Sequence, residues 1–399
     1  MNTVSKSRQY IVVFVITAIA VISYLLCHKV DMGQPIALDQ DKAIDLFIKS
    51  AAIEGNELQT EIFFTCEYNV QNIIMFLLVK ISGNVWKGIN CYYIATFFLI
   101  SIAMYHFMSN LDIPASIAVG LAVLTAFLPF HVDRGEGQMV TSNFFGVPLF
   151  LEMFYELIYC RRTDAHKKGY LILASFAAFI DIRLSIMVCI LFAILLIQRY
   201  DKEVVLHAVK YLIPLFLFSI VVGIISPTLK NINTETAKEE GMRILDLIEP
   251  IRYHVLARLS DIRFDYDISF LAHGESGLNS MGILFSIGFI CMMLGIFFEW
   301  ENDRRIAWMG MISFTVVIIA GVYGIGLVFE YFRIHITYWN RMAIFIIVCS
   351  AATLGILLNN ILQNLKEKFG KKAVSVAYII VNMIYLLSFF EFILRQNMY

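Results

Sequence analysis

Long runs of apolar residues, separated by short polar segments, follow one another along almost the whole chain. The runs are about 15–22 residues long, close to the roughly 20 residues that a helix needs to cross a bilayer. The pattern therefore predicts an all-α, polytopic membrane protein, with about 11 transmembrane helices in one domain over residues 1–399. We expect the spans at residues 10–27, 91–108, 112–130, 140–160, 169–182, 184–198, 209–226, 281–300, 306–328, 342–361 and 373–394.

The composition supports this class and excludes others. Hydrophobic residues make up 59% of the chain and charged residues 16%, whereas a soluble globular protein has roughly 45–50% and about 25%. No soluble domain of ordinary size fits between the runs. The formal net charge of -1 gives no reason to expect a nucleic-acid partner, so the partner that the composition predicts is the lipid bilayer.

The lysine and arginine residues of the short connections give the orientation. Cytoplasmic loops carry an excess of these residues. Eleven spans put every basic cluster on one side, which we assign to the cytoplasm, and the segments 28–90 and 227–280 on the outer side. The clusters are Lys6 and Arg8; Arg161, Arg162, Lys167 and Lys168; Arg199 and Lys202; Arg304 and Arg305; and Lys366, Lys368, Lys371 and Lys372.

Both long outer segments contain apolar residues at helical spacing next to a polar face. The first such stretch covers residues 44–52 and the second residues 242–248, and Pro250 is placed to open another short helix. Helices of this kind lie flat on the bilayer surface. We therefore expect interfacial helices in the loops 28–90 and 227–280, arranged around a groove.

Asp181 and Arg183 lie between two predicted spans that are each too short to cross comfortably. Charged groups at membrane depth are tolerated where they line protein or water. The pair therefore predicts two short helices below a water-filled outer cavity. Glu156, in the predicted span 140–160, is expected to be an interhelical hydrogen-bond partner or a group near the membrane interface rather than a catalyst.

Asp39 and Asp41 follow the first span directly and lie at the outer surface of an otherwise apolar protein. One interpretation is that they cap the interfacial helix, because a carboxylate accepts the free N–H groups of a first turn. The other is chemical: two neighbouring carboxylates raise one another's pKa, which suits one of them as a general base. If a divalent cation (Mg²⁺ or Mn²⁺) is used, this pair is its predicted ligand set.

The segment from His131 to Met139 concentrates charge between two apolar spans. Arg134 carries a planar fork of donors that suits phosphate, and Glu136 is a candidate base or ligand. Gly135 and Gly137 are expected to let the backbone turn tightly. The alternative is a solvated turn with an Arg–Asp pair.

Two further groups are candidates for contact with a phosphate or a sugar. Trp339 and Arg341 precede the predicted span 342–361, where they are either an interfacial anchor or a sugar and phosphate contact. His254 and Arg258, in the second long outer segment, are either site residues or solvated surface charges.

In this order, these features resemble the GT-C superfamily of membrane glycosyltransferases. The resemblance is carried by the early acidic pair, by Arg134-Gly-Glu-Gly-Gln138 followed by Val147-Pro-Leu149, by the stretch from Glu239 through Pro250 to His254, and by Trp339-Asn-Arg341. Gln138 stands where bacterial members have His. The chain also lacks the extracytoplasmic domain of many relatives, which suggests a compact enzyme or one that acts with a partner.

The resemblance implies transfer of a sugar from a polyprenyl-phosphate donor to a cell-surface or lipid-linked glycan acceptor. It places the enzyme in the bacterial inner membrane with its site facing the periplasm, and serotype-converting enzymes of O-antigen are one assignment. Asp41 would be the base, supported by Asp39. The donor would be bound by Arg134, Glu136, Gln138, Arg183, His254, Arg258, Trp339 and Arg341.

Two other functions remain open on the sequence. An O-antigen polymerase or ligase also has about a dozen spans and a large outer loop, and would depend on His254 and Arg258 rather than on the early aspartates. A flippase or transporter would move a lipid-linked glycan without changing its structure. No internal repeat of the kind found in many transporters occurs in the chain.

Overall fold

In the computed structural model of the chain, the residues described are 3–34, 36, 70–162, 166–198, 201–225, 241–251, 254, 256–269, 278–297, 303–321, 324–325 and 339–394. Within these ranges the regular structure is helical, and the only β-type pairing is an isolated bridge between Met242 and Gly321. The predicted all-α class is confirmed. The principal helices are α1 (Thr3–Cys27), α4 (Val70–Ser82), α5 (Val85–Asn110), α6 (Ala115–Ala126), α7 (Pro129–Ser142), α8 (Gly146–Phe154), the π-helix η1 (Tyr155–Tyr159), α9 (Lys167–Ile180), α10 (Ile182–Gln198), α11 (Lys202–Ile225), α12 (Ile244–Ile248), α13 (Ala257–Ser269), α14 (Gly282–Phe297), α15 (Arg304–Ala320), the 3₁₀ turn η4 (Trp339–Met342) and α17 (Ala343–Ile393).

Several helices are long and apolar enough to cross a membrane, as in a multi-pass membrane protein. Among the described residues, five stretches reach this length, and the exact number of eleven spans stays a prediction. The five are Lys6–Cys27, Val85–Asn110, Ala115–Gly135, Lys202–Val222 and Trp339–Ile393, and three shorter apolar helices are Val70–Ser82, Ile182–Gln198 and Gly282–Phe297.

The last long stretch is two helices that fold back on each other. Gly370, with φ 75° and ψ −175°, interrupts α17, and glycine adopts such a backbone without the steric cost of a Cβ. Phe285 of α14 accepts a hydrogen bond from Ser350 through its carbonyl, and its ring stacks against Phe392. A straight helix would separate Ser350 and Phe392 by about 60 Å, so the chain reverses at Gly370.

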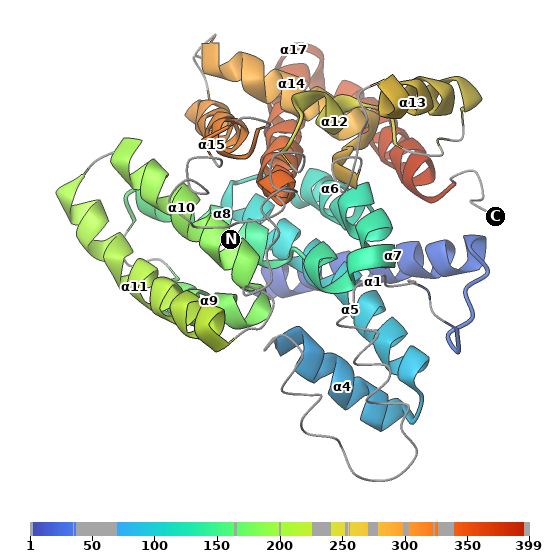
Figure 1. Cartoon of the computed structure of the whole chain (residues 1–399). Helices are drawn as coiled ribbons and strands as arrows, with labels where there is room; N and C mark the ends of the chain where they lie inside the picture. The colour runs from blue at the N-terminus through green and yellow to red at the C-terminus, as the bar shows by residue number, and fades with distance from the viewer. Residues whose placement is uncertain are drawn as a thin grey trace.

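The first half of α17 is the centre of the bundle, and α14, α15 and α6 pack around it. In Figure 1, α9, α10 and α11 form a separate group drawn in green, while α14, α15 and α17 appear in orange and red. In this view α6 and α7 lie below the orange and red helices and to the right of the green group. This arrangement brings the start of α17 close to α7 and α10, where the candidate site lies.

Peripheral helices expose apolar side chains, as expected of surfaces in contact with lipid. Ile11 on α1, Ile224 on α11 and Leu387 on the second half of α17 are each more than half exposed. Contiguous apolar surface of this kind is rare on soluble monomers and marks contact with a membrane or a partner. The exposed faces therefore agree with the bilayer as the surrounding medium.

Three local expectations were wrong. The segment 131–139 is helical rather than a tight turn, because Pro129 opens α7 at its first position and the helix continues through Gly135 to Ser142. The predicted span 140–160 is divided between α7, α8 and η1. Pro250 follows α12 and does not open a helix; the next helix begins at Ala257.

Candidate functional site

Arg134 and Arg263 are the largest fully buried side chains of the described residues, and Arg134 is the one that belongs to the candidate site. It lies on α7, where its guanidinium is stacked 4.4 Å from the centre of the Phe130 ring, one helical turn earlier. Its Nη2 atom donates a hydrogen bond to Asn279 Oδ1 over 3.3 Å. The cation that the sequence singles out is therefore held inside the protein, where a buried charge requires polar or anionic partners.

Asn279 connects Arg134 to the 3₁₀ turn η4 at the start of α17. Its Nδ2 atom donates to the backbone carbonyl of Asn340 over 3.2 Å. The Asn340 side chain is fully buried, and among the described residues neither its Nδ2 nor its Oδ1 atom has a hydrogen-bond partner. An unsatisfied buried polar group costs about 1–3 kcal/mol. A polar ligand or a water molecule that forms hydrogen bonds with this amide would remove that cost.

Arg183 and Arg341 line one small cavity beside this turn, together with Asp181, Asn143 and Phe130. The cavity measures about 20 Å³, which is room for a single water molecule. Phe130 also contacts Arg134, so this ring is shared by the Arg134 contact and by the cavity that Arg183 and Arg341 line. The three arginines come from α7, η4 and α10, and Asp181 lines the cavity together with two of them.

The position of Arg183 follows from the cap of α10. Asp181 Oδ1 accepts hydrogen bonds from the backbone N–H groups of Arg183 over 2.9 Å and of Leu184 over 3.3 Å. A carboxylate in this place satisfies the first N–H groups of a helix and meets its positive end. The predicted division into two short helices at Asp181 is confirmed, and the cap directs the start of α10 toward the cavity.

Gln71, Tyr92 and Asn143 form a hydrogen-bonded group that the sequence did not reveal, and Asn143 also lines the cavity. Gln71 Nε2 donates to the carbonyl of Ile180 over 2.8 Å, and its Oε1 accepts from Tyr92 and, over 3.0 Å, from Asn143. The group joins α4, α5 and α9 to the segment between α7 and α8. Single polar residues inside apolar runs gave no pattern from which this could have been predicted.

The other residues predicted for the site are either buried, exposed or outside the described residues. Trp339 and Arg341 are buried in η4. His254 is buried against the end of α17, with its Nε2 atom 3.7 Å from Glu391 Oε1, and burial lowers its pKa. Arg258 is exposed on α13. Asp39 and Asp41, together with the side chains of Glu136 and Gln138, lie outside the described residues.

Ile36, the last described residue before the two aspartates, is fixed to the beginning of α5. Its N–H donates to Asn90 Oδ1 over 3.3 Å, and Asn90 Nδ2 donates to the carbonyls of Met32 and Gln34 over 3.1 and 2.7 Å. One turn later on α5, the Tyr93 hydroxyl donates to the carbonyl of Val132 on α7 over 3.4 Å. The chain therefore enters residues 37–69 from the end of the bundle that contains Arg134.

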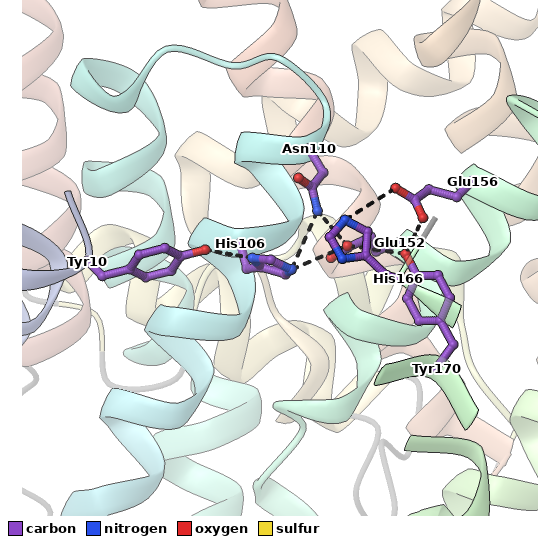
Figure 2. A network of polar contacts seen from close by, with 7 residues as sticks. All are labelled: Tyr10, His106, Asn110, Glu152, Glu156, His166 and Tyr170. Atoms are coloured by element: carbon purple, nitrogen blue, oxygen red, sulfur yellow. Dashed lines mark hydrogen bonds and ion pairs between the residues drawn. The ribbon is translucent and has the colours of Figure 1, made fainter. Parts of the chain in front are cut away.

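A second polar group lies at the other end of α5 (Figure 2). Glu152 and Glu156 are buried one turn apart, on α8 and η1, and the Tyr170 hydroxyl of α9 lies 3.2 Å from Glu152 Oε1 and donates to Glu156 Oε2 over 2.7 Å. The expected role of Glu156 as an interhelical hydrogen-bond partner is confirmed. His106 Nε2 lies 3.3 Å from Glu152 Oε1, and His166 completes the group.

The two groups are at opposite ends of the bundle. Tyr93 contacts the segment of Arg134 and His106 contacts Glu152, and thirteen residues of helix separate these two positions by about 20 Å. Among the described residues, Glu152, Glu156 and His166 are the cluster with spacing suited to a metal ion. The sequence signal that could have revealed it is the pair of glutamates four positions apart in an apolar run.

The chain matches no protein-family model, no curated protein and no solved structure.

Proposed function

We propose that the protein is a membrane glycosyltransferase that moves a sugar from a polyprenyl-phosphate donor to a glycan acceptor at the extracytoplasmic face of a bacterial inner membrane. The observation that carries the proposal is that Phe130 contacts Arg134 and also lines the cavity that Arg183 and Arg341 line. Guanidinium groups bind phosphate through paired, charge-assisted hydrogen bonds. The donor phosphate is assigned to this cluster.

The unsatisfied amide of Asn340 supports a polar ligand at the same place. A phosphate is larger than the present cavity of about 20 Å³, so binding requires the side chain of Arg183 or Arg341 to move. Arg183 is half-buried and Arg341 is more deeply buried, which makes Arg183 the side chain expected to swing. Trp339 is 2% exposed, so its assignment to the sugar, like that of Glu136 and Gln138 to the donor, rests on the sequence alone.

A long apolar groove supports a lipid-linked donor. It has a volume of about 690 Å³ and lies between α1, α6 and the second half of α17, with Ile16, Val123 and Phe389 among its walls. Leu124, which lines the groove, and Phe130, which lines the cavity of Arg183 and Arg341, flank the junction of α6 and α7. An isoprenoid chain in this groove would place its phosphate toward the arginines.

The proposed reaction is a direct displacement at the anomeric carbon. The bond from the acceptor oxygen to that carbon forms while the bond to the donor phosphate oxygen breaks, and Asp41 takes the proton of the acceptor hydroxyl. Asp39 supports Asp41. The polyprenyl phosphate leaves with the bonding electron pair, and the arginines stabilise its added negative charge.

One observation favours a second candidate, an ion-coupled transporter of lipid-linked glycans. Buried carboxylates and histidines inside a membrane protein commonly mark proton or ion pathways, and the chain of contacts from Tyr10 through His106 and Glu152 to Tyr170 is of this kind. A transporter would move its substrate and leave the glycan structure unchanged. The two functions are therefore separated by the product.

The test is a transfer assay on membranes that contain the full-length chain, with labelled polyprenyl-phosphate glucose as donor and surface glycan as acceptor. We expect Asp41→Asn to abolish transfer while the protein remains folded. Asp31→Asn is the matched control, because Asp31 is exposed on the same outer segment and its side chain accepts a hydrogen bond from the nearby Gly33 N–H over 2.8 Å. Transfer that persists in Asp41→Asn but requires His254 and Arg258 would instead favour a polymerase or ligase.

A further inference from the structure

We propose that Glu152, Glu156 and His166 form a binding site for one divalent transition-metal ion, at the end of the bundle opposite to Arg134. The site does not depend on the proposed sugar transfer. It is built from the end of α8, the π-helix η1 and the first residues before α9. Single π-helical turns inside longer helices are often found at functional sites.

The spacing of the three side chains is close to that of a metal site. One ligand atom from each lies within 4.8 Å of the others. Ligands about 2.1 Å from a tetrahedral zinc ion are about 3.4 Å apart, so each atom has to move by about 1 Å or less toward a shared centre. The His166 side chain is half exposed, and rotation of its ring supplies most of this movement.

An independent observation supports a cation at this site. Glu152 is 1% exposed, and within the described part of the chain its Oε2 atom has no hydrogen-bond partner. Its other oxygen, Oε1, accepts from Asn110 and lies near Tyr170 and His106. A buried carboxylate oxygen left without a donor is costly, and a metal ion at this position would satisfy it.

The surrounding hydrogen bonds engage one oxygen atom of each glutamate and leave its other oxygen atom for a metal ion. Tyr170 engages Oε2 of Glu156 over 2.7 Å, so the Oε1 atom of Glu156 remains directed toward His166 Nε2, 3.8 Å away (Figure 2). Tyr170 and Asn110 thus hold the two carboxylates from the outside. Partners of this kind orient metal ligands, and their loss typically weakens metal binding by about 10–100-fold.

The donor set indicates the class of metal. Two carboxylates and one imidazole suit Zn²⁺, Mn²⁺ or Fe²⁺, whereas Mg²⁺ and Ca²⁺ prefer oxygen ligands alone. By the usual affinity order, Zn²⁺ should bind more tightly than Mn²⁺. Three protein ligands leave a position for water or a substrate group, and the half-exposed His166 gives that position access to solvent.

The experiment is a titration of the purified full-length protein, stripped with a chelator, with Zn²⁺ and separately with Mn²⁺. We expect one tightly bound Zn²⁺ per chain and a rise in melting temperature on binding. Glu156→Gln and His166→Ala should each weaken Zn²⁺ binding by at least about tenfold. Glu203→Gln is the matched control, an exposed glutamate on α11 whose replacement should change nothing.

His166→Ala keeps the test decisive if a glutamate variant does not fold, because a half-exposed side chain contributes little to the core. The proposal is overturned if the wild type binds no Zn²⁺ in a saturable way. It is equally overturned if a bound Zn²⁺ is retained with full affinity in His166→Ala, because the ion then lies elsewhere. A bare proton site would show pH-dependent stability with no response to either metal.

Discussion

The guanidinium of Arg134 lies 4.4 Å from the centre of the Phe130 ring, and the same ring forms a wall of the cavity that Arg183 and Arg341 share. Phe130 thereby connects the Arg134 contact with the cavity that the other two arginines line. A flat aromatic face attracts and orients a guanidinium, which holds the plane of the Arg134 side chain in a defined position. The proposed donor site depends on this relationship.

Replacement of Arg134 by lysine should lower sugar transfer by about 10–100-fold, because lysine keeps the charge but loses the paired donors and the stacking. The loss should appear in the apparent affinity for the donor. Arg304→Lys, an exposed arginine on α15, is the control and should transfer normally. Equal activity of the two variants would contradict a role for Arg134 in holding phosphate.

Replacement of Asn340 by leucine should abolish donor binding without lowering the free energy of unfolding. The substitution removes a buried amide that has no partner and leaves the backbone carbonyl that accepts from Asn279. We expect the free energy of unfolding to stay the same or to rise by about 1 kcal/mol, while donor binding is lost. Calorimetry in detergent checks the first effect. A strongly destabilised Asn340→Leu protein would show that the amide serves the fold.

The pH dependence of stability should contain a contribution from Asp246. Burial raises the pKa of this carboxyl above its ordinary value of 3.8, and the Tyr266 hydroxyl and Arg263 oppose the shift only in part. The folded state therefore binds a proton more readily than the unfolded state, so the stabilisation is complete below pH 3.8 and is lost as the pH rises through the raised pKa.

Asp246→Asn should remove this contribution. We expect the melting temperature of the wild type to fall, relative to that of the variant, as the pH is raised from about 4 to 7. Tyr266 itself has its pKa raised to about 12 and does not titrate in this range. Parallel melting curves of the two proteins across the range would contradict the assignment.

The contact between α14 and α17 should tolerate no side chain at Gly288. A Cβ there would lie 2.5 Å from the Ser350 carbonyl oxygen, so Gly288→Ala should force the helices apart and cost about 1–3 kcal/mol of unfolding free energy. Gly169→Ala on α9 meets nothing within 4 Å and should be neutral or slightly stabilising. Similar melting temperatures for both variants would contradict the close packing described.

The sequence predicted the helical class and the break at Asp181, because each leaves a local signal: long apolar runs, and a charged pair between two short ones. The role of Arg134 in binding the donor stays a prediction. The sequence also predicted a tight turn at Gly135, but this residue lies inside the helix α7. Pro129 and tertiary packing outweigh the cost of glycine in a helix. Tyr93 packs closely against Gly135, so that glycine serves helix packing.

The polar groups formed by distant residues could not be predicted. Gln71 and Asn143 are single polar residues in apolar surroundings, and their hydrogen bond depends on how α4 packs beside the junction of α7 and α8. Glu152 meets His106 only because α5 and α8 are neighbours. Contacts of this kind follow from the three-dimensional arrangement and leave no trace in local periodicity.

The most direct test of the central claim is the binding of a polyprenyl-phosphate sugar to the purified protein in lipid nanodiscs. We expect saturable binding that free polyprenyl phosphate displaces, and we expect Arg341→Gln to weaken it by at least about tenfold, through the loss of a charged hydrogen bond. Arg304→Gln should bind as the wild type does. Undiminished binding by Arg341→Gln, or no binding by the wild type, would contradict the assignment of the arginine cluster to the donor phosphate.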